Sequence, residues 1–273
     1  MSEQFLWLIP LGFVVGTVGT MIGAGGGFLL VPVLLLMYPG VSPDNITAIS
    51  LAVIFFNALS GTFAYSRMGR IDYRSGLLFA LVTVPGAILG VLSTDKISRQ
   101  SFNAIFGSLM LMLSLYLIFH KPVIKKKEKK KIKAHTTRRI TEKNGATHVY
   151  SFDMKIGMWI SLITGYLSSL LGIGGGIIHV PSLVRLLNFP VHIATATSHL
   201  TLLIMAFTGT LVHIVTGSFS RSALFQIVFL VSGVLPGAQV GAVLSSKLHG
   251  QWILRVLAVA LAFTGIRIVF MAF

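Results

Sequence analysis

The sequence contains no cysteine and very few carboxylates. It has only 7 Asp and Glu among its 273 residues, against 22 Lys and Arg. The absence of cysteine excludes disulfides, thiolate metal sites and cysteine nucleophiles. Away from their ends, the apolar segments hold no Asp or Glu, so the carboxylates that serve cation-coupled carriers are missing. Spacings such as H-x-x-x-H or H-E-x-x-H are also missing, and we expect no metal or other cofactor.

Charge of either sign is scarce, whereas apolar residues are abundant. Charged residues make up 11% of the chain and hydrophobic residues 54%, with a mean hydropathy of +0.86. In soluble domains about a quarter of the residues are charged. The composition therefore predicts an all-α polytopic membrane protein. The N-terminus has no basic region and continues directly into apolar sequence, so we interpret it as a retained membrane segment.

The formal charge of +15 belongs mainly to one loop. More than half of the Lys and Arg residues lie between Lys121 and Lys155. This stretch has too few apolar residues to fold alone. We interpret residues 121–154 as a basic cytoplasmic linker that anionic headgroups attract, by about 1 kcal/mol per basic residue close to the surface. RNA binding has weak support, and we expect no nucleic-acid partner.

The apolar stretches are arranged in two sets of four. A membrane-spanning helix needs about 20 apolar residues. Eight stretches meet or approach that length: 5–38, 45–66, 75–94, 101–119, 156–187, 193–216, 222–245 and 252–272. Four lie on each side of the linker, which predicts a first membrane repeat over residues 1–120 and a second over residues 155–273.

Three blocks of sequence recur in both halves in the same order. The stretch GAGGGFLLVP at Gly23–Pro32 aligns with GIGGGIIHVP at Gly172–Pro181. Two further pairs are AISLAVIFFNALSGTFAY from Ala48 with ATSHLTLLIMAFTGTLVH from Ala196, and VPGAILG from Val84 with LPGAQVG from Leu235. Three matching blocks indicate a duplication.

The basic residues of the short loops favour repeats of opposite orientation. If the glycine-broken first segment of each half turns back as a helical hairpin, the halves are inverted and the bundle has 8 to 10 helices. Six basic residues then lie on the linker side: Arg67, Arg70, Arg74, Arg185, Lys247 and Arg255. Three lie opposite: Lys96, Arg99 and Arg221. This distribution fits the positive-inside rule better than a parallel arrangement does.

The glycine blocks interrupt segments that an anchor would keep helical. Glycine costs about 1 kcal/mol and proline about 3 kcal/mol relative to alanine inside a helix. Unwound backbone at membrane depth is tolerated where it is buried in protein or lines a cavity, and paired interruptions of this kind mark the midplane site of secondary transporters. We predict an anion-binding nest of backbone N–H groups at Gly25, Gly26 and Gly27 and at Gly174, Gly175 and Gly176. The alternative is that the glycines only allow close helix packing.

Polar side chains at membrane depth are mostly hydrogen-bond donors, which suits an anionic solute. Asn57, His179, Ser198, His199 and Gln239 complete the predicted substrate site. For each histidine, a hydrogen bond between helices without substrate contact is the alternative. Ser198 and His199 point about 100° apart on a helix, so they make a poor catalytic pair, and we do not expect an enzyme.

These motifs together resemble the TauE/SafE family of membrane permeases, the sulfite exporter or 4-toluene sulfonate uptake permeases. The resemblance rests on the two G-x-GGG-[FI]-[LI]-x-VP blocks, on SGTFAYSRMGRIDYRSGL from Ser60, on ATSH at Ala196 and on the two PGA blocks. It implies an integral protein of the cytoplasmic (inner) membrane that moves sulfite, organosulfonates or related anions, coupled to the proton gradient.

The sequence thus predicts a secondary transporter that works by alternating access. The proton-linked group would be His179 or His199, because histidine titrates near neutral pH. Two alternatives stay open: a passive anion channel, and a membrane scaffold that works through its basic linker. The substrate, the direction of transport and the oligomeric state, including a homodimer, also stay open.

Overall fold

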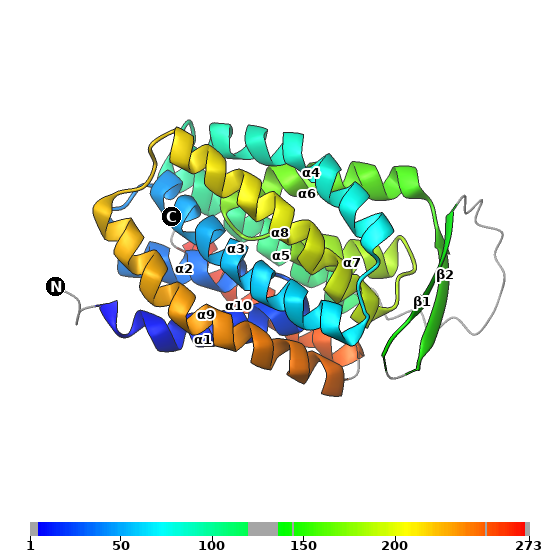
Figure 1. Cartoon of the computed structure of the whole chain (residues 1–273). Coiled ribbons are helices and arrows are strands. Elements are labelled where there is room, and N and C mark those ends of the chain that lie inside the picture. The colour runs from blue at the N-terminus through cyan, green and yellow to red at the C-terminus, as the bar shows by residue number, and fades with distance from the viewer. Residues whose placement is uncertain (1–4, 120–135, 144, 249, 271–273) are drawn as a thin grey trace.

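The computed structural model describes residues 5–119, 136–143, 145–248 and 250–270 (Figure 1). The described residues form ten helices and one two-stranded sheet. The helices are α1 (Leu8–Ile22), α2 (Gly27–Met37), α3 (Pro43–Met68), α4 (Tyr73–Thr94), α5 (Arg99–Phe119), α6 (Met154–Leu171), α7 (Gly176–Arg185), α8 (Val191–Val215), α9 (Arg221–Lys247) and α10 (Gly250–Phe270), and the strands are β1 (Thr136–Thr141) and β2 (Thr147–Phe152). The predicted helical architecture is confirmed, at the upper end of the expected number of helices.

Six of the described helices are long and apolar enough to cross a membrane. They are α3, α4, α5, α6, α8 and α9. The first apolar stretch of each half is divided into two helices, α1 with α2 and α6 with α7, and both divisions fall at the glycine blocks. The predicted interruptions are therefore present where the sequence placed them.

A left-handed glycine ends the first helix of each divided pair. Gly23 has a φ of 83°, and the next N–H, that of Ala24, donates to the carbonyl of Gly19 at 2.8 Å. At the end of α6, Gly172 has a φ of 64° and the Ile173 N–H donates to the carbonyl of Ser168 at 3.2 Å. Glycine adopts this conformation without the steric cost that a side chain brings, so the chain leaves the helix at these two points.

The two divided pairs lie toward opposite ends of the bundle. α1 and α2 lie toward the end that carries the N-terminus, and α6 and α7 lie toward the end that carries the strands (Figure 1). Arg99 at the start of α5 donates to the carbonyls of Val41 and Leu35, each at 2.7 Å, which closes the first of these ends. At the other end, the Phe189 ring lies 4.4 Å from that of Tyr150 in β2.

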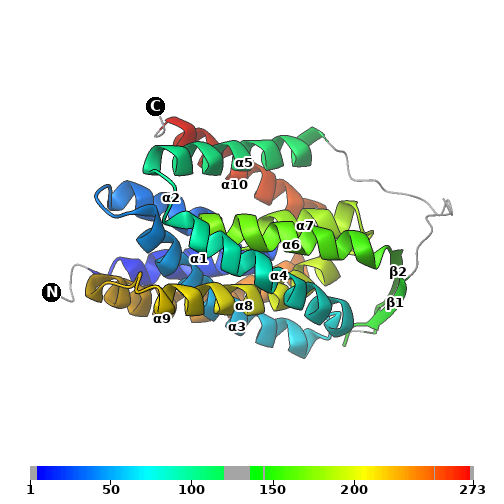
Figure 2. The same cartoon turned by 90° about the horizontal axis from the view of Figure 1, so that it is seen from above.

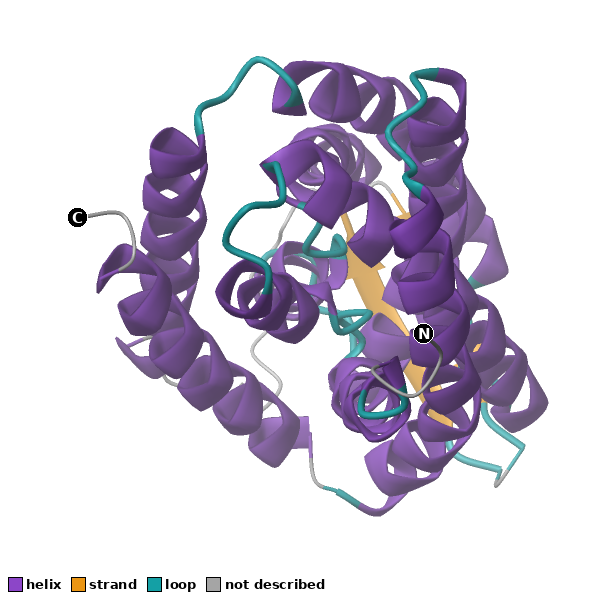
Figure 3. Ribbon diagram, turned by 90° about the vertical axis from the view of Figure 1, so that its left-hand side faces the viewer, coloured by secondary structure: helices purple, strands orange, loops and turns teal. Residues whose placement is uncertain are grey.

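Helices of the first half pack on helices of the second. α1 packs along α9, α4 along α6 and α3 along α8, while α5 and α10 lie side by side on one flank (Figure 2). The approaches are close: a Cβ at Gly16 would lie 2.6 Å from the carbonyl O of Val234, and one at Gly165 would lie 2.5 Å from that of Thr83. Viewed from the N-terminal end, the outer helices surround other helices at the centre, and the strands lie behind them (Figure 3).

The strands form a hairpin that the sequence analysis did not predict. The exposure of the side chains alternates along both strands, TTRRIT and THVYSF, which lie on either side of an N-G turn signal. Tyr150 and Phe152 are buried against Phe79 and Phe189. The membrane helices thus supply the apolar core that the linker lacks by itself. The lysine-rich residues 120–135 lie outside the described residues.

An ion pair also fastens the hairpin to the end of α3. Arg70 Nε lies 2.8 Å from a carboxylate oxygen of Glu142, and His148 Nε2 lies 2.9 Å from the other. The Lys143 N–H donates to the carbonyl of Met68 at 3.1 Å. Burial alone would raise the pKa of Glu142, but the hydrogen bonds and charges of Arg70 and His148 outweigh it and hold the pKa below its ordinary value.

Candidate functional site

The two glycine loops, residues 23–26 and 172–175, meet each other at the centre of the bundle. A Cβ at Gly27 would lie 2.5 Å from the carbonyl O of Gly172, and a Cβ at Gly176 would overlap the carbonyl O of Gly23. All six predicted nest glycines are buried. The contacts are with backbone, which cannot move aside as a flexible side chain can, so Gly27 and Gly176 are required for the loops to meet.

Most of the nest N–H groups are available. The N–H of Gly25 is used locally, because it donates to the carbonyl of Gly19 at 3.1 Å. The N–H groups of Gly26 and Gly27, and those of Gly174, Gly175 and Gly176, have no hydrogen-bond partner within the described ranges. They lie at the N-terminal ends of α2 and α7, where the helix dipole favours negative charge.

A chain of hydrogen bonds joins Asn57 and His199 to the first loop. Asn57 Nδ2 donates to the carbonyl of Gly25 at 3.0 Å, and Asn57 Oδ1 accepts from the Thr20 hydroxyl at 2.9 Å. His199 Nε2 lies 3.3 Å from the same hydroxyl. Because the Thr20 proton is given to Asn57, His199 is the donor to Thr20, and its Nδ1 has no partner among the residues described.

A serine from each half bonds the loop of the other half. Ser198 Oγ, on α8, donates to the carbonyl of Gly23 at 3.3 Å. Ser50 Oγ, on α3, donates to the carbonyl of Gly172. Gly23 and Gly172 directly follow the last residues of α1 and α6. Without the two serines, their carbonyl oxygens would lack a hydrogen-bond partner at membrane depth.

His179 and Gln239 are placed in separate contacts between helices. His179 Nε2 lies 3.2 Å from Ser161 Oγ, and its ring meets the edge of Phe79 at 5.6 Å. Gln239 Nε2 donates to the carbonyl and hydroxyl of Ser60, at 2.9 and 2.8 Å. The structure therefore brings Asn57, Ser198 and His199 to the glycine loops, whereas His179 and Gln239 join α7 to α6 and α9 to α3.

Two hydroxyls beside Gly175 were not among the predicted site residues. Thr164 Oγ1 and Ser168 Oγ are buried and have no hydrogen-bond partner in the part of the chain that the structure describes. A Cβ at Gly175 would lie 3.0 Å from Thr164 Cγ2 and 3.6 Å from Ser168 Oγ. Buried hydroxyls are normally paired, so these two can bond a ligand; the Ser168 hydroxyl lies beside Gly175, whereas Thr164 contacts it through its methyl group.

The repeat alignment contains the signal for these hydroxyls. At the offset that aligns the glycine blocks, Thr164 and Ser168 fall on Val15 and Gly19 of the first half. A Cβ at Gly26 would accordingly meet Val15, at 2.6 Å from its Cγ1. The second loop thus has hydroxyls where the first has an apolar side chain and a glycine, and this makes the second loop the more polar one.

The groups gathered here are neutral hydrogen-bonding groups. They are backbone N–H groups, hydroxyls, one amide and one imidazole, and none of them is a carboxylate or a fixed positive charge. The backbone N–H groups can only donate, whereas the hydroxyl, amide and imidazole groups can also accept. The unpaired N–H groups are therefore the groups here that suit the oxygens of an oxyanion.

Comparison with known proteins identifies the family of this chain. Residues 8–268 match the model of the family described as Sulfite exporter TauE/SafE. The chain is 32% identical to "Probable membrane transporter protein YunE" of Bacillus subtilis over 98% of both chains. It is 27% identical to a probable membrane transporter protein of Methanocaldococcus jannaschii, over 71% of this chain and 68% of that one. No solved structure matches.

The chain belongs to the TauE/SafE sulfite exporter family. It is accordingly a multi-pass membrane protein of a transporter family and not an enzyme. The resemblance drawn from the doubled glycine motif is confirmed over nearly the whole chain.

Proposed function

We propose that this member of the TauE/SafE family is a secondary transporter of small sulfur-containing oxyanions, such as sulfite or organosulfonates, in the cytoplasmic membrane. The observation that carries the proposal is the meeting of two glycine loops at which the N–H groups of Gly26, Gly27 and Gly174–Gly176, with the hydroxyls of Thr164 and Ser168, have no partner among the described residues. An oxyanion would satisfy these donors together.

The second loop holds the oxyanion. Its oxygens accept from the N–H groups of Gly174–Gly176 and from the hydroxyls of Thr164 and Ser168. Gly26 and Gly27 face the solute from the first loop, and Gly25 is held in place by Asn57. Ser198 and His199 position the same loop, while His179 and Gln239 act at a distance by fixing α7 and α9 on their neighbours.

The two halves are inverted repeats in this proposal. The support is the reciprocity of their contacts. Gly16 of α1 meets the carbonyl of Val234 on α9, and the aligned Gly165 of α6 meets the carbonyl of Thr83 on α4. The divided helix pairs also lie toward opposite ends of the bundle (Figure 1), as inversion requires.

Alternating access then moves units that combine both halves. Because α1 packs along α9 and α4 along α6, the sequence halves cannot rock as separate bodies without breaking their closest contacts. In this proposal α1 and α9 move together as one unit, and they move relative to a second unit that is formed by α4 and α6. The loop contacts at Gly27 and Gly176 lie between these units and must separate for the anion to pass.

His199 is the proton-linked group in this scheme. Its ring bonds Thr20 through Nε2 while Nδ1 has no described partner, so a proton can be added without displacing a hydrogen bond. His179 lies in a separate contact. Transport by His199→Gln is expected to lose its dependence on pH, and transport by His179→Gln to keep it. Unchanged pH dependence in His199→Gln would refute this assignment.

The direct test is flux into proteoliposomes across a panel of sulfite, taurine, sulfoacetate, sulfate and acetate. A carrier saturates with one sulfur oxyanion, while a passive channel does not saturate. A hydrogen bond to a charged group contributes about 1.5–3 kcal/mol, so Thr164→Val and Ser168→Ala should each raise the half-saturating concentration about ten- to hundredfold.

The matched control is Thr210→Val on α8, whose hydroxyl donates to the carbonyl of Ala206 in its own helix. It should transport as the unmodified chain does. Saturable flux that is unaffected by Thr164→Val and Ser168→Ala would leave the glycine loops as packing devices.

A further inference from the structure

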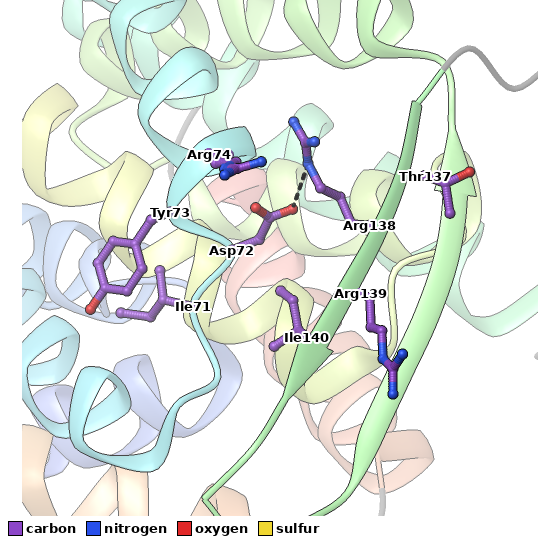
Figure 4. Close-up of a pocket in the computed structure, with 8 residues that line it drawn as sticks. All are labelled: Ile71, Asp72, Tyr73, Arg74, Thr137, Arg138, Arg139 and Ile140. Carbon is purple, nitrogen blue, oxygen red and sulfur yellow. Dashed lines mark ion pairs between the residues drawn. The ribbon is translucent and has the colours of Figure 1, made fainter.

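A second polar site lies at the end of the bundle, between the hairpin and the start of α4. It is a groove of about 480 Å³ lined by Ile71–Arg74 and by Thr137–Ile140 (Figure 4). This volume lies within the range of ligand pockets, about 300–1,000 Å³. Unlike an ordinary apolar pocket, the groove is lined by three arginines, which indicates a charged ligand.

Positive charge in the groove exceeds negative charge. Arg74, Arg138 and Arg139 line it together with a single carboxylate, that of Asp72. Asp72 is already engaged, because its oxygens accept from the Ser75 N–H at 3.1 Å and from the Tyr150 hydroxyl at 2.9 Å. It cannot neutralise three guanidinium groups from this buried position.

Two of the arginines converge from opposite walls. Arg138 on β1 and Arg74 on α4 lie on the same side of Asp72, whereas Arg139 extends from the other face of the strand (Figure 4). Arg138 Nε lies 3.2 Å from Ser75 Oγ and 3.8 Å from Asp72 Oδ2. Arg74 is exposed and makes no ion pair within the described part of the chain. Asp72 supplies one negative charge beside Arg138, and a further anion between the two guanidinium groups would lower the repulsion that remains between them.

We propose that this groove binds a phosphate-type oxyanion between Arg74 and Arg138, and that the anion fastens the hairpin to the bundle. Guanidinium forks match tetrahedral oxyanions in geometry. Tyr73 also lines the groove and is 49% exposed, and exposed tyrosines are enriched at the level of lipid headgroups. The phosphate therefore comes from a lipid headgroup or from solution.

The site is independent of the proposed transport site. It joins the turn before α4 to the hairpin, and through Tyr150 and Phe189 to the turn before α8. An anion in the groove would make charge-assisted hydrogen bonds with Arg74 and Arg138 and would lower the repulsion between these two side chains. Binding should therefore hold the hairpin against the turn before α4 and the turn before α8.

Hydrogen exchange of the hairpin amides, residues 136–143 and 145–152, tests the proposal on the full chain in a non-ionic, phosphate-free detergent. Four conditions are compared: detergent alone, added inorganic phosphate, added short-chain phosphatidylglycerol, and sodium chloride at matched ionic strength. At a concentration ten times the dissociation constant, an anion should slow exchange from the undocked hairpin about tenfold. Slowing by phosphate alone assigns a soluble anion, and slowing by the lipid alone assigns a headgroup.

Arg74→Gln should abolish the slowing, and it leaves the contacts of Arg138 with Ser75 and Asp72 in place. Arg138→Gln should abolish it too, with faster basal exchange. Arg221→Gln, an exposed arginine at the start of α9 at the opposite end, is the control and should respond as the unmodified chain does. Equal slowing by chloride, no slowing in any condition, or slowing that persists in Arg74→Gln would overturn the proposal.

Discussion

Replacing Gly175 by alanine separates the binding role of the second glycine loop from its packing role. Gly175 has φ −58° and ψ −19°, so alanine adopts its conformation, and such a change stabilises by about 0.4–1 kcal/mol through the unfolded chain. The added Cβ would lie 3.0 Å from Thr164 Cγ2 and 3.3 Å from Met205 Sδ. Tight packing of this kind costs about 1–3 kcal/mol, so the net loss of stability should lie between about 0 and 2.6 kcal/mol.

Transport by the Gly175→Ala variant should nevertheless fall sharply. The new methyl would lie 3.6 Å from Ser168 Oγ, in the space where the oxyanion would contact that hydroxyl and the loop N–H groups. The measurements are thermal unfolding in detergent and the half-saturating concentration for sulfite in proteoliposomes. We expect a small shift in unfolding temperature with at least a tenfold rise in half-saturating concentration, corresponding to the loss of about 1.4 kcal/mol of binding.

Alanine substitutions of two further glycines serve as controls. Gly176→Ala would overlap the backbone of Gly23 and Ala24 and should prevent the loops from meeting, so this variant should fold poorly. Gly40→Ala meets nothing within 4 Å and should be neutral in both assays. Unimpaired transport by Gly175→Ala, or a Gly176→Ala variant as stable as the unmodified chain, would refute the reasoning.

Three other changes test the site and the hairpin. Asn57→Ala leaves the Gly25 carbonyl without a partner and removes the acceptor of the Thr20 hydroxyl proton, so it should lower the free energy of unfolding by about 1–3 kcal/mol. The lowered pKa of Glu142 implies hairpin stability that is fully present above the ordinary glutamate value of 4.5 and is lost as pH falls below it. Exchange of the hairpin amides should therefore speed up at low pH by more than the intrinsic rate changes, and Glu142→Gln should remove this pH dependence. Replacing the lysines of residues 125–133 by serine should leave sulfite flux unchanged, whereas a scaffold that works through the linker would lose its function.

The sequence predicted the helix breaks because glycine acts locally, whereas the two prolines, Pro32 and Pro181, lie inside α2 and α7 and do not break them. Gly23 and Gly172 adopt the left-handed conformation that ends a helix. Glycine favours this conformation whatever its tertiary contacts are, so it can be inferred from the sequence alone. Asn57, Ser198 and His199 were chosen because polar groups at membrane depth are costly, and the structure brings all three to the loops. His179 and Gln239 satisfied the same criterion, but their partners, Ser161 and Ser60, lie on neighbouring helices.

The hairpin and the two free hydroxyls depend on tertiary contacts. The exposure of the side chains alternates along β1 and β2, but the sequences TTRRIT and THVYSF do not alternate between apolar and polar residues. The apolar face of the hairpin is defined by its packing on Phe79 and Phe189. Thr164 and Ser168 read as ordinary helix residues until Gly175 is placed beside them. A comparison of the two halves would have found them, because each is a hydroxyl residue at a position where the first half has an apolar residue or a glycine.

The packing of helices of one half on helices of the other has a consequence for biosynthesis. The carbonyl O of Leu230, on α9, lies against Gly12 on α1, although α1 leaves the ribosome long before α9 is made. Until then, the glycine face of α1 must be covered by lipid or by an insertion chaperone. The amino-terminal half produced alone should therefore enter the membrane without reaching its mature arrangement, and it should recover that arrangement when the carboxyl-terminal half is co-expressed as a separate chain.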